Sequence, residues 1–91
     1  MKRRGRYDIY RDVMETVMRR GASNITRISY GANLPVDRAK KIVLFLCSRG
    51  LLKDESFGDS TLYRMTGKGG QFLNALRTVR RYVQPDEEDA L

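Results

Sequence analysis

The chain of 91 residues has no histidine, no tryptophan and a single cysteine, Cys47. These absences exclude a zinc finger, a disulfide framework and most histidine-dependent catalysis. No hydrophobic run approaches the roughly 18 apolar residues of a membrane span, and the N-terminal segment has no apolar signal region. Acidic side chains are present, but none is spaced with a base or nucleophile as an active site requires. We therefore expect no enzymatic activity, no metal, no cofactor and no membrane partner, and we expect Cys47 to be a small buried hydrophobic residue.

Positive charge is present in excess and is unevenly distributed. The chain has 18 Lys and Arg against 11 Asp and Glu, a net charge of +7. Residues 1–49 hold twelve basic against four acidic residues, a balance of +8, whereas residues 86–89 are all acidic. A basic body with an acidic tail suits a polyanion ligand such as nucleic acid, for which the tail is an internal competitor. A basic protein that is merely soluble is the alternative.

Apolar spacing predicts four helices and one hairpin. Positions Ile9, Val13 and Val17 recur every four residues, and Gly21 ends that helix. Thr66 is a good cap for the last helix. The predicted elements, in chain order, are helices over residues 7–20, 25–32 and 35–49, strands over 51–57 and 61–65, and a helix over 67–83.

This order predicts a mainly α fold with a small β-hairpin (α+β), the winged helix-turn-helix arrangement in which the hairpin is the wing. We expect residues 1–6 to be a basic disordered arm and residues 7–84 to form the domain. Within it, the helix over about 67–84 is the expected dimerisation element. Residues 85–91 form an acidic tail.

The segment from Thr26 to Ile42 reads as a helix, a tight turn and a second helix. Asn33 suits the left-handed turn position, because its short amide tolerates positive φ. The buried face expected for the second of these helices consists of Ala39, Ile42, Val43 and Leu46. The positions expected to point elsewhere are Val36, Asp37, Arg38, Lys40, Lys41 and Leu44. The candidate DNA-binding residues among them are Val36, Arg38, Lys40 and Lys41.

Side-chain chemistry divides these candidates. The planar guanidinium of Arg38 can pair with both acceptors on a guanine edge, so Arg38 is the expected base contact. Lys40 and Lys41 suit phosphates, because an ammonium has little directional preference. Asp37 favours the helix dipole but repels phosphate, so we interpret it as a cap rather than a base reader.

The wing and the arm are weaker candidates. The hairpin carries more acidic than basic residues, and its turn, Gly58-Asp59-Ser60, offers no cation. We expect the wing to stay clear of DNA or to contact phosphate only through Arg64 and neighbouring hydroxyls. The arm could track a groove through Arg3, Arg4 and Arg6, or it could be simply solvated.

Two apolar sets are candidates for a homodimer interface. Phe72, Leu76, Val79 and Val83 have the 4-3-4 spacing of a short coiled-coil seam. In the first helix, Met14 and Met18 widen the apolar stripe and could cover a partner subunit. Plain core packing is the alternative for these two methionines.

The runs "TRISYGANL", "RGLLK" and "YRMTGKGGQFL" resemble small archaeal winged-helix proteins, namely the 10a-type DNA-binding proteins and the ArnR-like predicted transcriptional regulators. The similarity covers about residues 7–84. It implies a cytoplasmic, nucleoid-associated binder of double-stranded DNA that dimerises through its C-terminal helix. It also implies that Arg27 lies near the DNA backbone. Leu44 departs from the pattern, since a polar residue is expected there, and the short last helix argues against a long coiled coil.

Two other functions remain open. A winged helix can serve as a protein-docking module, which the acidic wing and Leu44 favour and the overall positive charge opposes. RNA binding usually needs an aromatic stacking platform, and we expect the five tyrosines and three phenylalanines to fall mostly at core positions.

Overall fold

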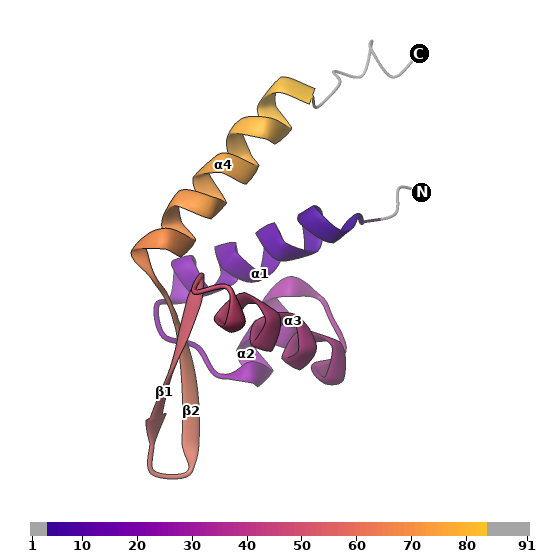
Figure 1. Cartoon of the computed structure of the whole chain (residues 1–91). Helices are drawn as coiled ribbons and strands as arrows, with labels where there is room; N and C mark the ends of the chain where they lie inside the picture. The colour runs from indigo at the N-terminus through magenta and orange to yellow at the C-terminus, as the bar shows by residue number, and fades with distance from the viewer. Residues whose placement is uncertain (1–3, 84–91) are drawn as a thin grey trace.

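The computed structural model describes residues 4–83 and contains four helices and one two-stranded antiparallel sheet. The expected order of elements and the fold class, a winged helix, are confirmed (Figure 1). Each boundary lies within one residue of its prediction. The elements are α1 (Arg6–Arg20), α2 (Ile25–Ala32), α3 (Val36–Ser48), β1 (Leu52–Phe57), β2 (Ser60–Met65) and α4 (Gly67–Val83).

The turn between α2 and α3 forms for the reasons that its sequence suggests. The side chain of Asn24 accepts a hydrogen bond of 2.9 Å from the backbone N–H of Arg27, which caps the start of α2. Asn33 ends the helix with a φ of 57°, in the left-handed region. The next N–H, of Leu34, donates to the carbonyl oxygen of Ser29 at 2.9 Å. The two helices are therefore held at a fixed angle by local hydrogen bonds.

A single core lies around α1, which packs against α2, α3, α4 and β2. The loop after α1 is joined to the hairpin by two backbone hydrogen bonds between Ser23 and Tyr63, of 2.8 and 3.0 Å. Burial of each large apolar core side chain contributes about 1.5–3 kcal/mol to the stability of the folded state. The largest fully buried apolar side chains are Met14, Ile28, Leu46, Leu52, Leu73, Val13, Val17 and Val43.

Helix α4 begins against the core and then leaves it. Thr66 caps it, since its Oγ1 accepts a hydrogen bond of 2.9 Å from the N–H of Gly69. Figure 1 shows the helix running diagonally away from the body, so that its C-terminal half projects beyond α1. Val79, Tyr82 and Val83 are accordingly 57%, 84% and 68% exposed. Within residues 4–83, no helix has the length and apolar character needed to cross a membrane.

The expectation of a disordered arm is wrong for residues 4–6. Arg6 is the first residue of α1. The Arg4 guanidinium donates to Asp12 at 2.8 Å and to the carbonyl oxygens of Ala32 and Asn33 at 2.6 and 2.9 Å. A short arm becomes ordered here because one arginine satisfies a carboxylate and two helix-end carbonyls together. Residues 1–3, with Arg3, and the acidic tail lie outside the described residues.

Candidate nucleic-acid interface

The outward side of α3 carries polar, basic and apolar residues in three rows. At 100° per residue, Asp37, Lys41 and Leu44 lie opposite the buried row of Ala39, Val43 and Leu46. Arg38 and Phe45 lie on the flank nearer α1, and Val36 and Lys40 lie on the other flank. All seven of these non-core residues are exposed, which was expected for every one of them except Phe45.

The cations on this helix have no acidic partners within the described chain. The ion pairs there involve Arg4, Arg11, Arg64 and Arg77, and none involves Arg38, Lys40 or Lys41. The only acidic residue on α3 is Asp37 in its first turn. Because no carboxylate neutralises them, these three cations are available to an anion.

The other predicted basic residues are spread over separate elements. Arg27 is exposed on the first turn of α2, and its side chain forms no ion pair with a described residue. Arg6 is exposed at the start of α1. Arg4 is engaged with Asp12 and the α2–α3 turn, so it acts as a structural brace and its guanidinium is not free for DNA.

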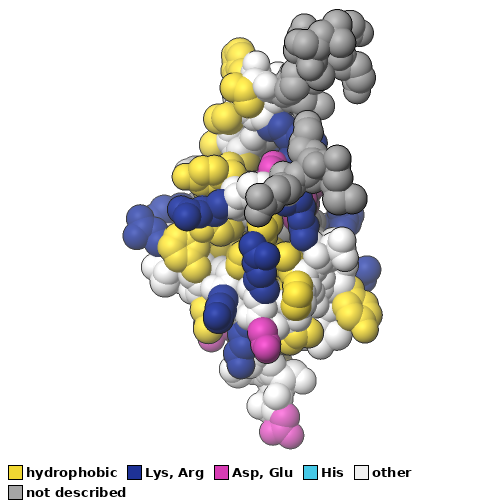
Figure 2. Space-filling model, turned by 90° about the vertical axis from the view of Figure 1, so that its right-hand side faces the viewer, with side chains coloured by type: hydrophobic (Ala, Val, Ile, Leu, Met, Phe, Trp, Pro, Cys, Tyr) yellow, Lys and Arg dark blue, Asp and Glu magenta, His cyan; other side chains and the backbone are white. Residues whose placement is uncertain are grey.

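The hairpin places negative charge at its end. Gly58, with a φ of 61°, opens a two-residue turn that is completed by Asp59, and the strands pair from Leu52–Met65 to Phe57–Ser60. Arg64 donates to Glu55 at 3.3 Å, which offsets its charge. Figure 2, which views the ends of α1 and α3, shows Lys and Arg side chains among hydrophobic ones across the middle, with an acidic side chain at the end of the hairpin.

The expectation that the aromatic residues fall mostly at core positions is wrong. Five of the eight are exposed, namely Tyr7, Tyr30, Phe45, Phe57 and Tyr82. Sequence reasoning missed Phe45 in particular, because it is apolar and lies next to Leu46 of the buried face. The helical phase set by Ala39, Val43 and Leu46 would have placed it outside.

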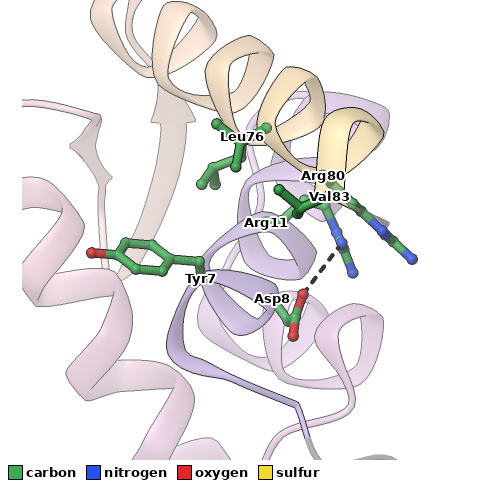
Figure 3. Close-up of a pocket in the computed structure, with 7 residues that line it drawn as sticks. Tyr7, Asp8, Arg11, Leu76, Arg80 and Val83 are labelled. Atoms are coloured by element: carbon green, nitrogen blue, oxygen red, sulfur yellow. Dashed lines mark ion pairs between the residues drawn. The ribbon is translucent and has the colours of Figure 1, made fainter. Parts of the chain in front are cut away.

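A groove of about 350 Å³ separates the first turns of α1 from the outer half of α4, and we call it the α1–α4 groove (Figure 3). Asp8 and Arg11, 3.5 Å apart, form an ion pair on its α1 side. On its other side the groove meets the predicted dimerisation residues of α4. Its lining residues are Tyr7, Asp8, Arg11, Leu76, Val79, Arg80 and Val83.

The remaining dimer candidates divide between core and surface. Met14 is fully buried inside the chain, so it cannot face a partner, and that prediction is corrected. The plain-core alternative holds for it because the side chain fills the space under α4. Met18 is 46% exposed. Phe72 is half-buried, with its ring 6.4 Å from that of Tyr10, so part of its surface is already used within the chain.

A family model described as winged helix-turn-helix matches residues 3–84. The chain belongs to this family. Among solved structures, this winged helix is similar to the DNA-binding protein Sso10a-2 of Sulfolobus solfataricus, with 25% identity, a TM-score of 0.82, and 89% and 83% of the two chains covered. The resemblance to archaeal winged-helix proteins is thereby confirmed.

Two more distant structures share the fold. AF1382 of Archaeoglobus fulgidus is 15% identical with a TM-score of 0.73, covering 90% of this chain and 93% of that one. The PcaV transcriptional regulator of Streptomyces coelicolor is 19% identical with a TM-score of 0.71, covering 90% and 66%. No match is found among curated proteins.

Cys47 of this winged helix is half-buried on α3 and packs against the core. Burial, together with the nearby Asp54 carboxylate, raises the pKa of the Cys47 thiol. A raised pKa lowers the thiolate fraction, which is the opposite of what a reactive cysteine needs. Among residues 4–83 no three His, Cys, Asp or Glu side chains are grouped as a metal site would require.

Proposed function

We propose that this chain is a non-enzymatic protein that binds double-stranded DNA with α3 in the major groove. The observation that carries the proposal is that α3 has three exposed cations, Arg38, Lys40 and Lys41, none of which has an acidic partner in the described chain. The likeness to Sso10a-2, a DNA-binding protein, supports it. A winged helix normally uses this helix as its reader.

Each side chain on α3 has a role set by its chemistry. Arg38, two residues into the helix, presents its guanidinium fork to a guanine edge. Lys40 and Lys41 bind phosphates on the two sides of the groove, since they lie on different faces of the helix. Val36, 44% exposed at the first position, offers an apolar contact to a thymine methyl group.

Contacts outside α3 position the protein without reading sequence. Arg27, exposed at the start of α2, is assigned to the DNA backbone, and Arg3 and Arg6 supply further positive charge for the phosphates. The wing stays clear of the duplex, because Asp59 at its end repels phosphate and Arg64 is occupied by Glu55. The interface is therefore compact and centred on α3.

We further propose that two copies associate through α4. Leu76, Val79 and Val83 form one row on this helix, and all three line the α1–α4 groove. Val79 and Val83 are more than half exposed in the single chain, so their burial would favour association. Met18, which contacts Arg77 of α4, lies outside the residues that line the groove, and Met14 is buried and takes no part.

The salt dependence of the binding affinity follows from the number of phosphates that the protein neutralises. If each subunit neutralises about four phosphates, the slope of log affinity against log salt is about −3.6 per subunit and about −7 for a dimer. Direct base contacts contribute roughly 1–3 kcal/mol each, and only one or two side chains are placed to make them. Such a protein binds with modest sequence preference, as a transcriptional regulator or a chromatin-type, nucleoid-associated protein of an archaeal cytoplasm.

Fluorescence anisotropy of a labelled random-sequence duplex, titrated with protein at several salt concentrations, tests the proposal. We expect micromolar or tighter binding with a slope of about −4 to −7. Absence of binding at about 50 mM salt would contradict it and would favour the protein-docking alternative.

A further inference from the structure

A second hollow surface lies on the other side of Tyr7, between α1 and α3. Two adjoining hollows, of about 300 and 340 Å³, share Arg6, Tyr10 and Phe45 and together form what we call the α1–α3 groove. It continues past the end of α3 to Phe72 and Lys68 at the start of α4. The proposed duplex contacts use only the rim of this groove, through Arg6, Arg38 and Lys41.

The middle of the groove is aromatic. The rings of Tyr10 and Phe45 are stacked, with centroids 5.5 Å apart and planes at 20°. Tyr7 meets Tyr10 edge-on at 5.8 Å. Phe45 and Tyr7 nevertheless remain 45% and 62% exposed. Leaving apolar rings in water is unfavourable, and a group of them on one surface is typical of a binding site.

The rim of the groove is basic. Of its lining residues, none is acidic. The ion pairs found in residues 4–83 use none of the rim cations except Arg4. The free cations of the rim are Arg6, Arg38, Lys41, Arg49 and Lys68.

Exposed rings between unpaired cations fit a ligand that offers both phosphates and open base faces. A duplex keeps its bases stacked inside, so it cannot use the rings, whereas an unpaired strand can. The part of the rim that runs along α3 from Arg38 to Arg49 is about 16 Å long, at a rise of 1.5 Å per residue. That length spans roughly four or five stacked nucleotides at about 3.4 Å each.

We propose that the α1–α3 groove binds single-stranded nucleic acid. Phe45 is the principal platform for a base, Tyr7 is a second one, and the rim cations hold the phosphates. This activity does not rest on duplex binding by α3. The two ligands compete, however, because both use Arg6, Arg38 and Lys41.

Anisotropy with three labelled ligands tests the proposal: a 15-nucleotide oligo(dT), an abasic strand of the same length, and a duplex. The abasic strand keeps the phosphates but lacks bases, so it isolates the stacking contribution. We expect the wild-type protein to prefer oligo(dT) to the abasic strand by about fivefold or more. A further titration with labelled oligo(rU) shows whether the groove prefers single-stranded DNA or single-stranded RNA.

Variants assign the preference to the groove. Phe45→Leu keeps an apolar side chain against Tyr10 but removes the principal ring, so we expect the preference for bases to fall towards what Tyr7 alone supplies. Phe57→Leu, the same change at a 59% exposed ring on the hairpin, should leave it intact. Lys68→Gln should weaken strand binding and spare the duplex, whereas Lys53→Gln on β1 should change neither.

Equal binding of oligo(dT) and the abasic strand by the wild-type protein would overturn the proposal. An equal loss of strand and duplex binding in Phe45→Leu would also overturn it, since that result would report a disturbed α3. If the duplex fails to bind while the preference for bases persists, only the duplex proposal fails.

Discussion

The guanidinium of Arg4 donates a hydrogen bond of 2.6 Å to the backbone carbonyl oxygen of Ala32, the last residue of α2. Carbonyls at a helix C-terminus have no partner within the helix, so this contact satisfies one of them. The same side chain reaches Asn33 in the turn and Asp12 on α1. Arg4 therefore ties the N-terminal segment to the turn that sets the direction of α3.

Arg4→Gln should lower stability by about 1 kcal/mol, because it removes charged hydrogen bonds at a partly exposed site. For a domain of this size the midpoint of thermal unfolding should fall by about 4–8 °C. Arg6→Gln, which removes the same charge two residues later, is the control and should have little effect. Circular dichroism measures the unfolding midpoints of both variants. Identical midpoints would show that the hydrogen bonds of Arg4 do not stabilise the fold.

Gly69 lies against the chain at the start of α4. A Cβ at this position would collide with the carbonyl oxygen of Leu51, whereas a Cβ at Gly67 would meet nothing within 4 Å. We expect Gly69→Ala to lower the unfolding midpoint by more than about 5 °C, because backbone cannot yield as a flexible side chain does. Gly67→Ala should leave the midpoint unchanged or slightly higher. A Gly69→Ala midpoint equal to that of Gly67→Ala would contradict this packing.

Local signals in the sequence were sufficient for the fold. Asn24, Asn33 and Thr66 cap or end helices through hydrogen bonds with near neighbours, so their roles can be read from short segments. The cations of α3 were also predictable, because the helical phase alone puts them outside.

What the sequence did not reveal depends on contacts between distant segments. Arg4 is ordered by Ala32 and Asn33, which are 28 and 29 residues away in the chain. Met14 is buried because α4 covers it. The apolar spacing within α1 does not show which side of that helix a later helix will cover. The exposed ring of Phe45 becomes part of a groove only because Tyr10 lies beside it.

Helix α4 offers a test of association. Val79→Glu puts a charge into the apolar row, where it would have to be desolvated at an interface, so the dimer should dissociate. Thr78→Glu adds the same charge at an exposed position of α4 outside this row and should leave the dimer intact. Sedimentation equilibrium gives the mass directly. A dimeric Val79→Glu protein would show that this row is not the interface, and a monomeric wild type would remove the dimer proposal altogether.

The most direct test of duplex binding by α3 compares two double variants that each remove two positive charges. The first double variant, Arg38→Ala with Lys41→Ala, changes the proposed recognition helix α3. The second, Arg19→Ala with Arg20→Ala, changes exposed residues at the C-terminal end of α1. Anisotropy of a labelled duplex should show at least about tenfold weaker binding for the first pair. Its salt slope should fall by about 0.9 per subunit, because only Lys41 of this pair is assigned to a phosphate. The second pair should bind nearly as the wild type does. Equal affinities for the two double variants would contradict the account, because binding would then depend on total charge and not on α3.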